Sequence, residues 1–164
     1  EIDACLVGSD MCIRDRIMTS SIVLVTGGFD PLHSGHISYF KSAKAIAPLS
    51  PLAVGLNSDD WLRRKKGKPF MPMNERISIV RELKMVDAVI EYDDSDNTSN
   101  SAIEQLLQIY DKVIFANGGD RHNENVPEYE KFKDDNNVIF RWAVGGLNKL
   151  NSSSWILSEW ENKK

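Results

Sequence analysis

Two of the chain's three histidines stand three residues apart, directly after a pair of glycines. Val25–His36 reads VTGGFDPLHSGH, with Gly27 and Gly28 ahead of His33 and His36. Glycines let a backbone approach a ligand closely, and residues three apart share one face of a helix. Two imidazoles and the free amides of a helix start then converge on one point, which suits a polyphosphate. The alternatives are purely structural histidines and a zinc site, although zinc usually takes three or four protein ligands.

The segments that must position these histidines alternate between short apolar runs and amphipathic stretches. Strands are predicted at 21–26, 51–56, 87–92, 111–116 and 137–144. Helices are predicted at 34–47, 74–86, 99–110, 126–133 and 152–162. Strands separated by helices indicate right-handed β-α-β units. We therefore predict an α/β, Rossmann-like fold with a five-stranded parallel sheet and helices on both faces. The histidines follow the first strand, at the edge where such sheets bind ligands.

Composition narrows the classes of partner. The chain has 164 residues, 41% of them hydrophobic, and a formal net charge of −4. This balance gives no reason to expect a nucleic acid or a membrane surface as partner, and no apolar run is long enough to span a bilayer. We expect a cytoplasmic protein.

Residues 1–17 show no hydrophobic periodicity and no signal-peptide pattern. Met11–Arg16 reads MCIRDR, which resembles a translated sequencing-library adaptor. We predict that 1–17 is a non-native leader, with a disordered native tail as the alternative, and that 18–164 is a single domain. Cys5 and Cys12 both lie in this leader, so disulfides and thiolate metal sites do not enter the prediction.

The segment GGFDPLHSGH resembles the G-x-F-D-x-x-H-x-G-H signature of the cytidylyltransferase-like nucleotidyltransferases. Further segments resemble the family's motifs in the same order: VGLNSDD, KGKPFMPMNERISIV, VDAVI, NGGD and NSSSWIL. The resemblance implies that a phosphorylated acceptor attacks the α-phosphorus of ATP or CTP while pyrophosphate leaves. It implies Mg²⁺ bound with the nucleotide, and an acceptor that is a sugar phosphate, a polyol phosphate or a cofactor precursor. A homodimer is left open.

Roles for individual residues follow from the resemblance. His33 and His36 stabilise the triphosphate, Lys65 and Lys68 of the basic loop RRKKGKP close over its β- and γ-phosphates, and Arg76 reaches phosphate. The alternative for Lys65 and Lys68 is that they belong to a solvated surface loop, and the alternative for Arg76 is that it is an exposed charge on a helix. The predicted nucleotide site comprises Gly27, Gly28, Phe29, Asp30, Asn57, Asp59, Gly118, Gly119, Asp120, Ser152, Ser153 and Ser154. No direct metal ligation by the protein is predicted, except that Asp30 resembles the motif aspartate near the acceptor and metal.

Structural alternatives exist for several of these residues. Phe29 is expected to pack the turn, Asp59 to cap the next turn, and one of the final serines to cap the last helix. The NGGD segment, which includes Asp120, can be a tight turn without a ligand. We expect the tryptophans at 142, 155 and 160 to pack against the sheet and the final helix.

Two positions depart from the glycerol-3-phosphate cytidylyltransferases of this family. Those enzymes carry threonine where the chain has Gly28 and arginine where it has Leu147. The NGGD and LNSD segments look closer to heptose-1-phosphate adenylyltransferases, which favours ATP slightly over CTP. The segment DRHNENVPEYEKF matches neither branch, so the acceptor stays unassigned.

Two other functions compete with catalysis. A non-catalytic nucleotide-binding module would be expected to have lost a histidine or the basic loop, and this chain keeps both. A fragment of a class I aminoacyl-tRNA synthetase would need a far longer chain and a Lys-Met-Ser-Lys-Ser-type loop.

Overall fold

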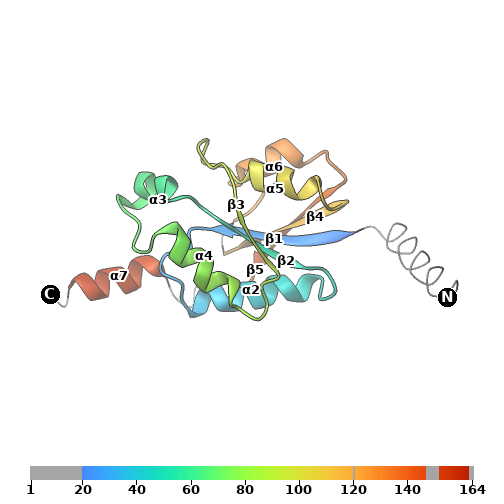
Figure 1. The fold of residues 1–164 in the computed structure, drawn as a ribbon. Coiled ribbons are helices and arrows are strands. Elements are labelled where there is room, and N and C mark those ends of the chain that lie inside the picture. Colours follow the sequence, from blue (N-terminus) through green and yellow to red (C-terminus); the bar gives the residue numbers. More distant parts are fainter. Residues whose placement is uncertain (1–19, 120, 147–151, 163–164) are drawn as a thin grey trace, which may run out of the picture.

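Five parallel strands form one sheet in the computed structural model, which describes residues 20–119, 121–146 and 152–162. The strands are β1 (Ser21–Gly27), β2 (Leu52–Leu56), β3 (Ala88–Glu91), β4 (Lys112–Gly118) and β5 (Val138–Val144). Their order across the sheet is β3-β2-β1-β4-β5, and every neighbouring pair is parallel (Figure 1). The predicted fold class and strand number are confirmed.

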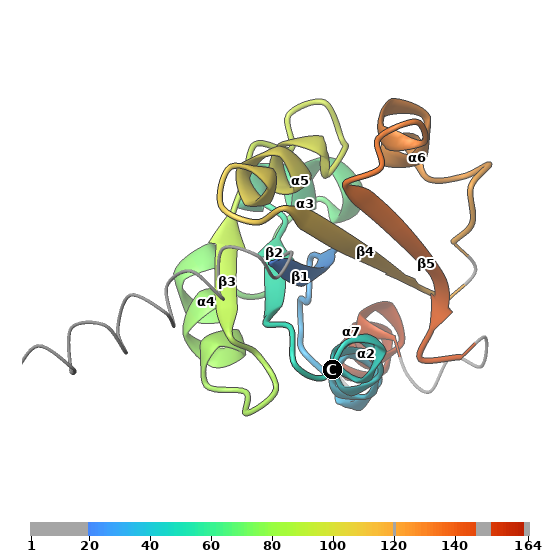
Figure 2. The same cartoon turned by 90° about the vertical axis from the view of Figure 1, so that its right-hand side faces the viewer.

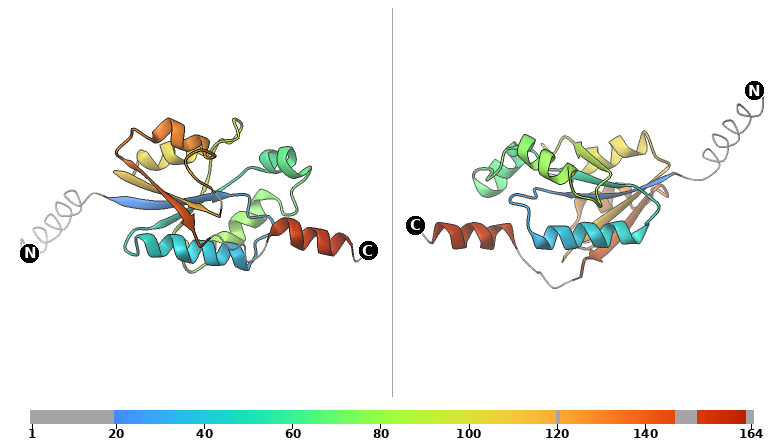
Figure 3. Two further views of the ribbon diagram at one scale, coloured as in Figure 1. Left: turned by 180° about the vertical axis from the view of Figure 1, so that it is seen from behind. Right: turned by 60° about the horizontal axis from the view of Figure 1, so that its bottom comes forward.

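Helices cover both faces of the sheet. They are α2 (Ser34–Ile46), α3 (Asp59–Lys66), α4 (Met73–Arg81), α5 (Asn100–Leu107), α6 (Pro127–Phe132) and α7 (Ser153–Glu161). Figure 2 shows α5 and α6 on one side of the sheet, with α2 and α4 on the other. In both views of Figure 3, α7 projects beyond the end of the sheet. None of the described helices is long and apolar enough to cross a membrane.

The central strand β1 is apolar because both of its faces are covered. Ile22 and Leu24 belong to a buried cluster shared with α5 and α6, whereas Val23 and Val25 belong to one shared with α2 and α4. All four side chains are at most 1% exposed. A strand of a parallel sheet buried on both faces reads as a continuous hydrophobic run, which is the pattern that predicted it.

The connections leave β1 in opposite directions. From β1 the chain builds outward through β2 to β3, then returns to place β4 and β5 on the other side of β1. The strand order therefore reverses at the carboxyl ends of β1 and β4, where open α/β sheets have their ligand crevice. The histidine motif begins at this point.

The basic loop predicted at 63–68 is wrong in part, because Arg63–Lys66 form the last turn of the helix α3. Local capping explains this helix. The Ser58 hydroxyl accepts a hydrogen bond from the Trp61 N–H at 3.0 Å, and Asp59 and Asp60 occupy the first turn. Gly67, with φ of 88°, ends the helix by donating its N–H to the Arg63 carbonyl. Acidic residues at the start and basic residues at the end stabilise a helix through its dipole.

Two further expectations on side chains need correction. Trp155 and Trp160 are each 53% exposed on α7, whereas Trp142 packs against Tyr129 and Phe140 as expected. Ser152 occupies the position before α7 but makes no side-chain capping hydrogen bond. Because α7 projects beyond the end of the sheet, its two tryptophans do not cover a face of the sheet.

Candidate active site

The two motif histidines form a stacked pair at the start of α2. Their ring centroids lie 3.7 Å apart with an interplanar angle of 24°. His33 is the N-cap residue, and its Nδ1 accepts a hydrogen bond from the Gly35 N–H at 3.1 Å. An imidazole nitrogen that accepts carries no proton, so the neutral ring of His33 carries its proton on Nε2. The helix cap therefore fixes the tautomer that offers an N–H at the far side of the ring.

His36 is held uncharged by its surroundings. Burial lowers its pKa to about 3, and His33 and Lys66 contribute in the same direction. The Phe29 ring packs edge-on against it at a centroid distance of 5.0 Å. Within the described part of the chain, the buried Nδ1 of His36 has no hydrogen-bond partner. A neutral, incompletely satisfied imidazole at a ligand edge is suited to binding a group that brings negative charge.

The paired glycines are required by packing inside the protein. A Cβ atom on Gly27 would lie 2.9 Å from the Phe29 ring, and one on Gly28 would lie 2.9 Å from Leu62. Phe29 is buried and adopts a positive φ of 47°, which turns the chain toward α2. Its expected packing role is confirmed. The sequence argument ascribed the glycines to ligand approach, but the space that their side chains would fill is already occupied by the protein.

Asp30 connects the glycine turn to the segment that follows α3. Its carboxylate is buried and accepts hydrogen bonds from the backbone N–H groups of Phe70 and Met71, both at 2.7 Å. Lys66 donates its ammonium to the Asp30 carbonyl at 3.0 Å. Both carboxylate oxygens thus position the segment that carries Lys68. The role of Asp30 toward a metal stays a prediction.

Arg76 is the largest fully buried side chain among the described residues, so the alternative of an exposed helix charge is wrong. Its guanidinium pairs with Asp59 at 2.6 Å. It also donates to the backbone carbonyls of Gly28, Asn57 and Met71 at 2.9, 2.8 and 3.1 Å. These bonds occupy four of the five guanidinium N–H donors and join the ends of β1 and β2 to α4. The predicted contact with phosphate remains a prediction.

Asp59 and Asn57 are likewise bound to other parts of the protein. Asp59 accepts from Arg76 and from the Met73 N–H at 3.2 Å, while Ser58 rather than Asp59 provides the side-chain cap of α3. The buried Asn57 amide donates to the Tyr92 hydroxyl at 2.9 Å. Both residues order the carboxyl end of β2.

The lysines of α3 form a cluster of like charges. Burial lowers the pKa of Lys65, and the nearby Arg121 and Lys66 lower it further. Burial also lowers the pKa of Lys66, with Asp30 opposing this effect and Arg76 adding to it. The Lys65 ammonium lies 4.5 Å from the centre of the Trp61 ring. Neighbouring cations repel one another, and an anion that binds between them relieves this repulsion.

The remaining predicted site residues lie around the sheet edge. Gly118 packs so tightly that a Cβ would meet Tyr39 at 3.0 Å, and Gly119 is exposed with φ of 66°. Asp120 lies outside the described residues. Ser153 is buried and donates its hydroxyl to the Pro31 carbonyl at 2.9 Å, which joins α7 to the histidine turn. Ser152 is also buried, and Ser154 is exposed.

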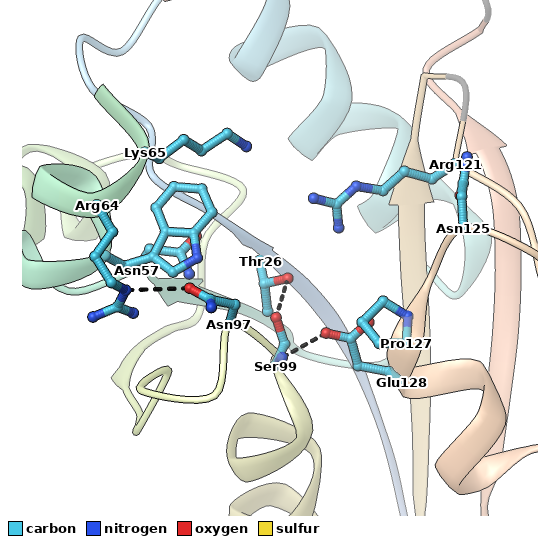
Figure 4. Close-up of a pocket in the computed structure, with 11 residues that line it drawn as sticks. Thr26, Asn57, Arg64, Lys65, Asn97, Ser99, Arg121, Asn125, Pro127 and Glu128 are labelled. Atoms are coloured by element: carbon cyan, nitrogen blue, oxygen red, sulfur yellow. Dashed lines mark hydrogen bonds between the residues drawn. The ribbon is translucent and has the colours of Figure 1, made fainter. Parts of the chain in front are cut away.

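A pocket of about 470 Å³ opens at the carboxyl ends of β1 and β2 (Figure 4). Its polar lining combines three cations, three amides, two hydroxyls and one carboxylate. The lining residues are Thr26, Asn57, Trp61, Arg64, Lys65, Asn97, Ser99, Arg121, Asn125, Pro127 and Glu128. Figure 4 shows Lys65 and Arg121 reaching toward each other over the pocket. The structure thus places a positively charged pocket beside the end of β1.

Sequence reasoning assigned only Asn57 and Lys65 of this pocket to the site. The others follow the ends of β3 and β4, in the segments 93–99 and 121–128, or lie on α3 and β1. Their signal was position alone, because loops after parallel strands meet at one edge of the sheet. No motif covered those in the segments 93–99 and 121–128, whereas Thr26 lies in VTGGFDPLHSGH and Arg64 in RRKKGKP.

Comparisons with known proteins agree with this architecture. A sequence model of the family described as cytidylyltransferase-like matches residues 24–144. The chain is 36% identical over 116 residues to bifunctional protein HldE of Helicobacter hepaticus, covering 68% of this chain and 22% of that protein. It is 34% identical over 139 residues to bifunctional protein HldE of Shewanella piezotolerans, covering 84% of this chain and 26% of that one. The chain therefore spans about a quarter of the length of these relatives.

A solved structure is also similar. The lipopolysaccharide core biosynthesis protein from Thermoplasma volcanium superimposes with a TM-score of 0.59 and 26% sequence identity. The match covers 80% of this chain and 98% of that one. Nearly the whole of that protein therefore corresponds to the domain described above.

Proposed function

The chain belongs to the cytidylyltransferase-like family of nucleotidyltransferases, and on that premise we propose that it transfers AMP or CMP to a small phosphorylated acceptor. The observation that carries the proposal is the stacked His33–His36 pair at the end of β1, in which burial keeps His36 uncharged. Beside it, Lys65 and Lys66 have pKa values lowered by burial and by neighbouring cations. This combination favours a ligand with several negative charges.

The reaction needs no protein base. A phosphate oxygen of the acceptor, already ionised near neutral pH, attacks the α-phosphorus of the nucleoside triphosphate. The bond from the α-phosphorus to the oxygen bridging it to the β-phosphate breaks, and pyrophosphate leaves with that electron pair. Such a transfer depends on alignment of the two phosphates and on stabilisation of charge as it develops.

The chain's own residues supply both requirements. His33 offers a fixed Nε2–H, and His36 adds a second imidazole three residues later on the same helix turn. Preorganised donors of this kind stabilise the transition state because they need no rearrangement during the reaction. Lys65 and Lys68 neutralise the β- and γ-phosphates, and the Asp30 bonds to Phe70 and Met71 hold the segment that carries Lys68.

We propose that Mg²⁺ enters this site as an ion carried by the nucleotide. Among the described residues, no three His, Cys, Asp or Glu side chains gather into a metal-binding group. Both oxygens of Asp30, the one predicted candidate, accept backbone hydrogen bonds. When bound, Mg²⁺ neutralises phosphate charge, which complements the lysines.

We propose a sugar phosphate as the acceptor and ATP as the donor. Relatives named bifunctional protein HldE and a neighbour titled a lipopolysaccharide core biosynthesis protein support a carbohydrate substrate. The resemblance of NGGD and LNSD to heptose-1-phosphate adenylyltransferases supports ATP over CTP. The pocket beside β1 supports a small anionic acceptor, because Arg64, Lys65 and Arg121 line it.

The test is a pyrophosphate-release screen of ATP, CTP, GTP and UTP against sugar phosphates and polyol phosphates, with Mg²⁺ present. Replacing His36 with alanine should lower kcat by about 10²-fold with little change in the nucleotide KM, because the lost donor acts mainly in the transition state. The exposed His122→Ala serves as the matched control. Nucleotide binding without pyrophosphate release from any pair would instead identify a non-catalytic binding module.

A further inference from the structure

Glu128 is the only acidic residue among the described residues that line the pocket, and the hydrogen bonding of its buried carboxylate is incomplete. The residue lies in the first turn of α6, lines the pocket and is 3% exposed. Its Oε1 accepts a hydrogen bond from the Ser99 N–H (Figure 4). Its Oε2 is buried and finds no donor anywhere in the described ranges.

A buried carboxylate oxygen without a donor is costly, so its presence at a pocket needs a reason. An ionised carboxylate only accepts hydrogen bonds, and an unsatisfied buried acceptor destabilises the protein. The missing partner is therefore a hydrogen-bond donor, and hydroxyl and ammonium groups are the donors that small phosphorylated substrates commonly carry. Three cations, Arg64, Lys65 and Arg121, line the same pocket and disfavour a ligand that brings an ammonium group. A hydroxyl on an anionic ligand satisfies both conditions.

We propose that Glu128 binds a hydroxyl group of the acceptor through Oε2 and so selects hydroxylated phosphates, the sugar and polyol class, over other phosphate esters. This assignment rests on the proposed function for its identification of the pocket's occupant. The phosphate of the acceptor lies toward Arg64 and Arg121, since Lys65 is assigned to the triphosphate, and its hydroxyl lies toward Glu128.

The surroundings hold Glu128 ready for such a contact. Ser99, which precedes α5, donates its N–H to Glu128 and its hydroxyl to Thr26 at 3.0 Å. The chain of contacts fixes the carboxylate against two secondary structure elements, β1 and α5. A hydrogen-bond acceptor held rigidly in the protein, such as this carboxylate, loses little freedom on binding. It therefore discriminates strongly between ligands that have and lack the matching hydrogen-bond donor.

The position of the pocket favours the acceptor over the nucleotide as its occupant, because the histidines and Glu128 lie on opposite sides of the sheet. His33, His36 and the start of α7 lie on the side of α2, whereas Ser99 and Glu128 belong to the elements α5 and α6 on the opposite side. In-line transfer places the attacking and leaving oxygens on opposite sides of the phosphorus. A triphosphate held at the histidines leaves the pocket on the other side to the nucleophile.

Binding measurements on the full chain test this directly. Glycerol 3-phosphate and mannose 1-phosphate carry hydroxyls, and methyl phosphate is a phosphate ester without one. By calorimetry, the unmodified protein should bind the hydroxylated probes at least tenfold more tightly than methyl phosphate. Glu128→Gln, whose amide NH₂ in place of Oε2 cannot accept a hydrogen bond from the hydroxyl, should reduce that preference. Its affinity for methyl phosphate and ATP should stay within about twofold.

A matched control lies on the same helix. Glu130 is exposed and pairs with Lys133, so Glu130→Gln should leave every affinity unchanged. Thermal melting separates recognition from folding. Glu128→Gln keeps an oxygen for the Ser99 N–H and nearly the same volume, so without ligand its Tm should stay close to that of the unmodified protein.

Each alternative result has one meaning. No preference for hydroxylated probes in the unmodified protein, or the same preference in Glu128→Gln, overturns the proposal. A lower Tm with unchanged selectivity makes Glu128 a purely structural residue, and a loss of ATP affinity assigns the hydroxyl to the ribose. Pyrophosphate release is scored separately, so the proposed activity can fail while the hydroxyl preference stands, and the reverse.

Discussion

Replacing His36 with glutamine should remove part of the pH dependence of folding stability. In the folded protein, burial and then electrostatic interactions with His33 and Lys66 lower the pKa of His36 from 6.5 to about 3. The unfolded chain therefore binds a proton at His36 more tightly than the folded chain does. The stability that comes from the neutral ring is complete above pH 6.5 and is lost progressively as the pH falls toward 3.

The size of this loss follows from the same two pKa values. At pH 5 the unfolded histidine is almost fully protonated and the folded one is neutral, which costs the folded state about 2 kcal/mol. The wild-type protein should thus lose about 2 kcal/mol more than His36→Gln between pH 7.5 and pH 5. The carboxylates that titrate in this range are common to both proteins, so their effects cancel in the comparison.

Urea unfolding at four pH values between 7.5 and 5 measures the difference. His122→Asn is the control, because His122 is exposed and should give the pH dependence of the wild type. Parallel stability curves for wild type and His36→Gln would refute the argument that burial keeps His36 neutral. A non-hydrolysable ATP analogue should narrow the difference, since phosphate charge near His36 raises its pKa. An unchanged difference would place the triphosphate away from this histidine.

Three further predictions concern other parts of the chain. Arg76→Met should lower the free energy of unfolding by about 3 kcal/mol in urea titrations, because it leaves Asp59 without its buried partner, whereas exposed Arg81→Met should not. The double variant Lys65→Ala, Lys68→Ala should lose at least tenfold in turnover, measured as pyrophosphate release, while Arg63→Ala, paired with Asp60 at the surface, should retain it. Removing residues 1–17 should leave Tm and turnover unchanged; a drop in either in a calorimetric scan and a rate assay would make them native structure.

The strands and their order were accessible from sequence because their signal is local. Each strand is a short apolar run between helical segments, and parallel β-α-β units restrict the possible topologies. The helix α3 was missed because Leu62 is its only buried side chain, so it has almost no apolar periodicity. Its capping residues, Ser58 at the start and Gly67 at the end, were visible and would have identified it.

Side-chain roles were harder to predict because they depend on distant partners. Arg76 is buried through the carbonyls of Gly28, Asn57 and Met71, which come from three separate segments. Nothing beside Arg76 in the sequence distinguishes this arrangement from an exposed helix charge. Glu128 likewise resembles a solvated first-turn glutamate, but it is 3% exposed and accepts a hydrogen bond from the distant Ser99.

The family motif contains residues of two different kinds. Gly27 and Gly28 have their side-chain space filled by the protein, and the Asp30 carboxylate and Arg76 spend their hydrogen bonds on backbone groups. These residues build the frame in which the histidine pair is held. Six of the eleven residues that line the pocket come instead from the segments 93–99 and 121–128, where no family motif was found. Under the proposed function, acceptor choice can therefore change through these two segments while the histidine site stays intact, because the hydrogen bonds of Asp30 and Arg76 go to other segments.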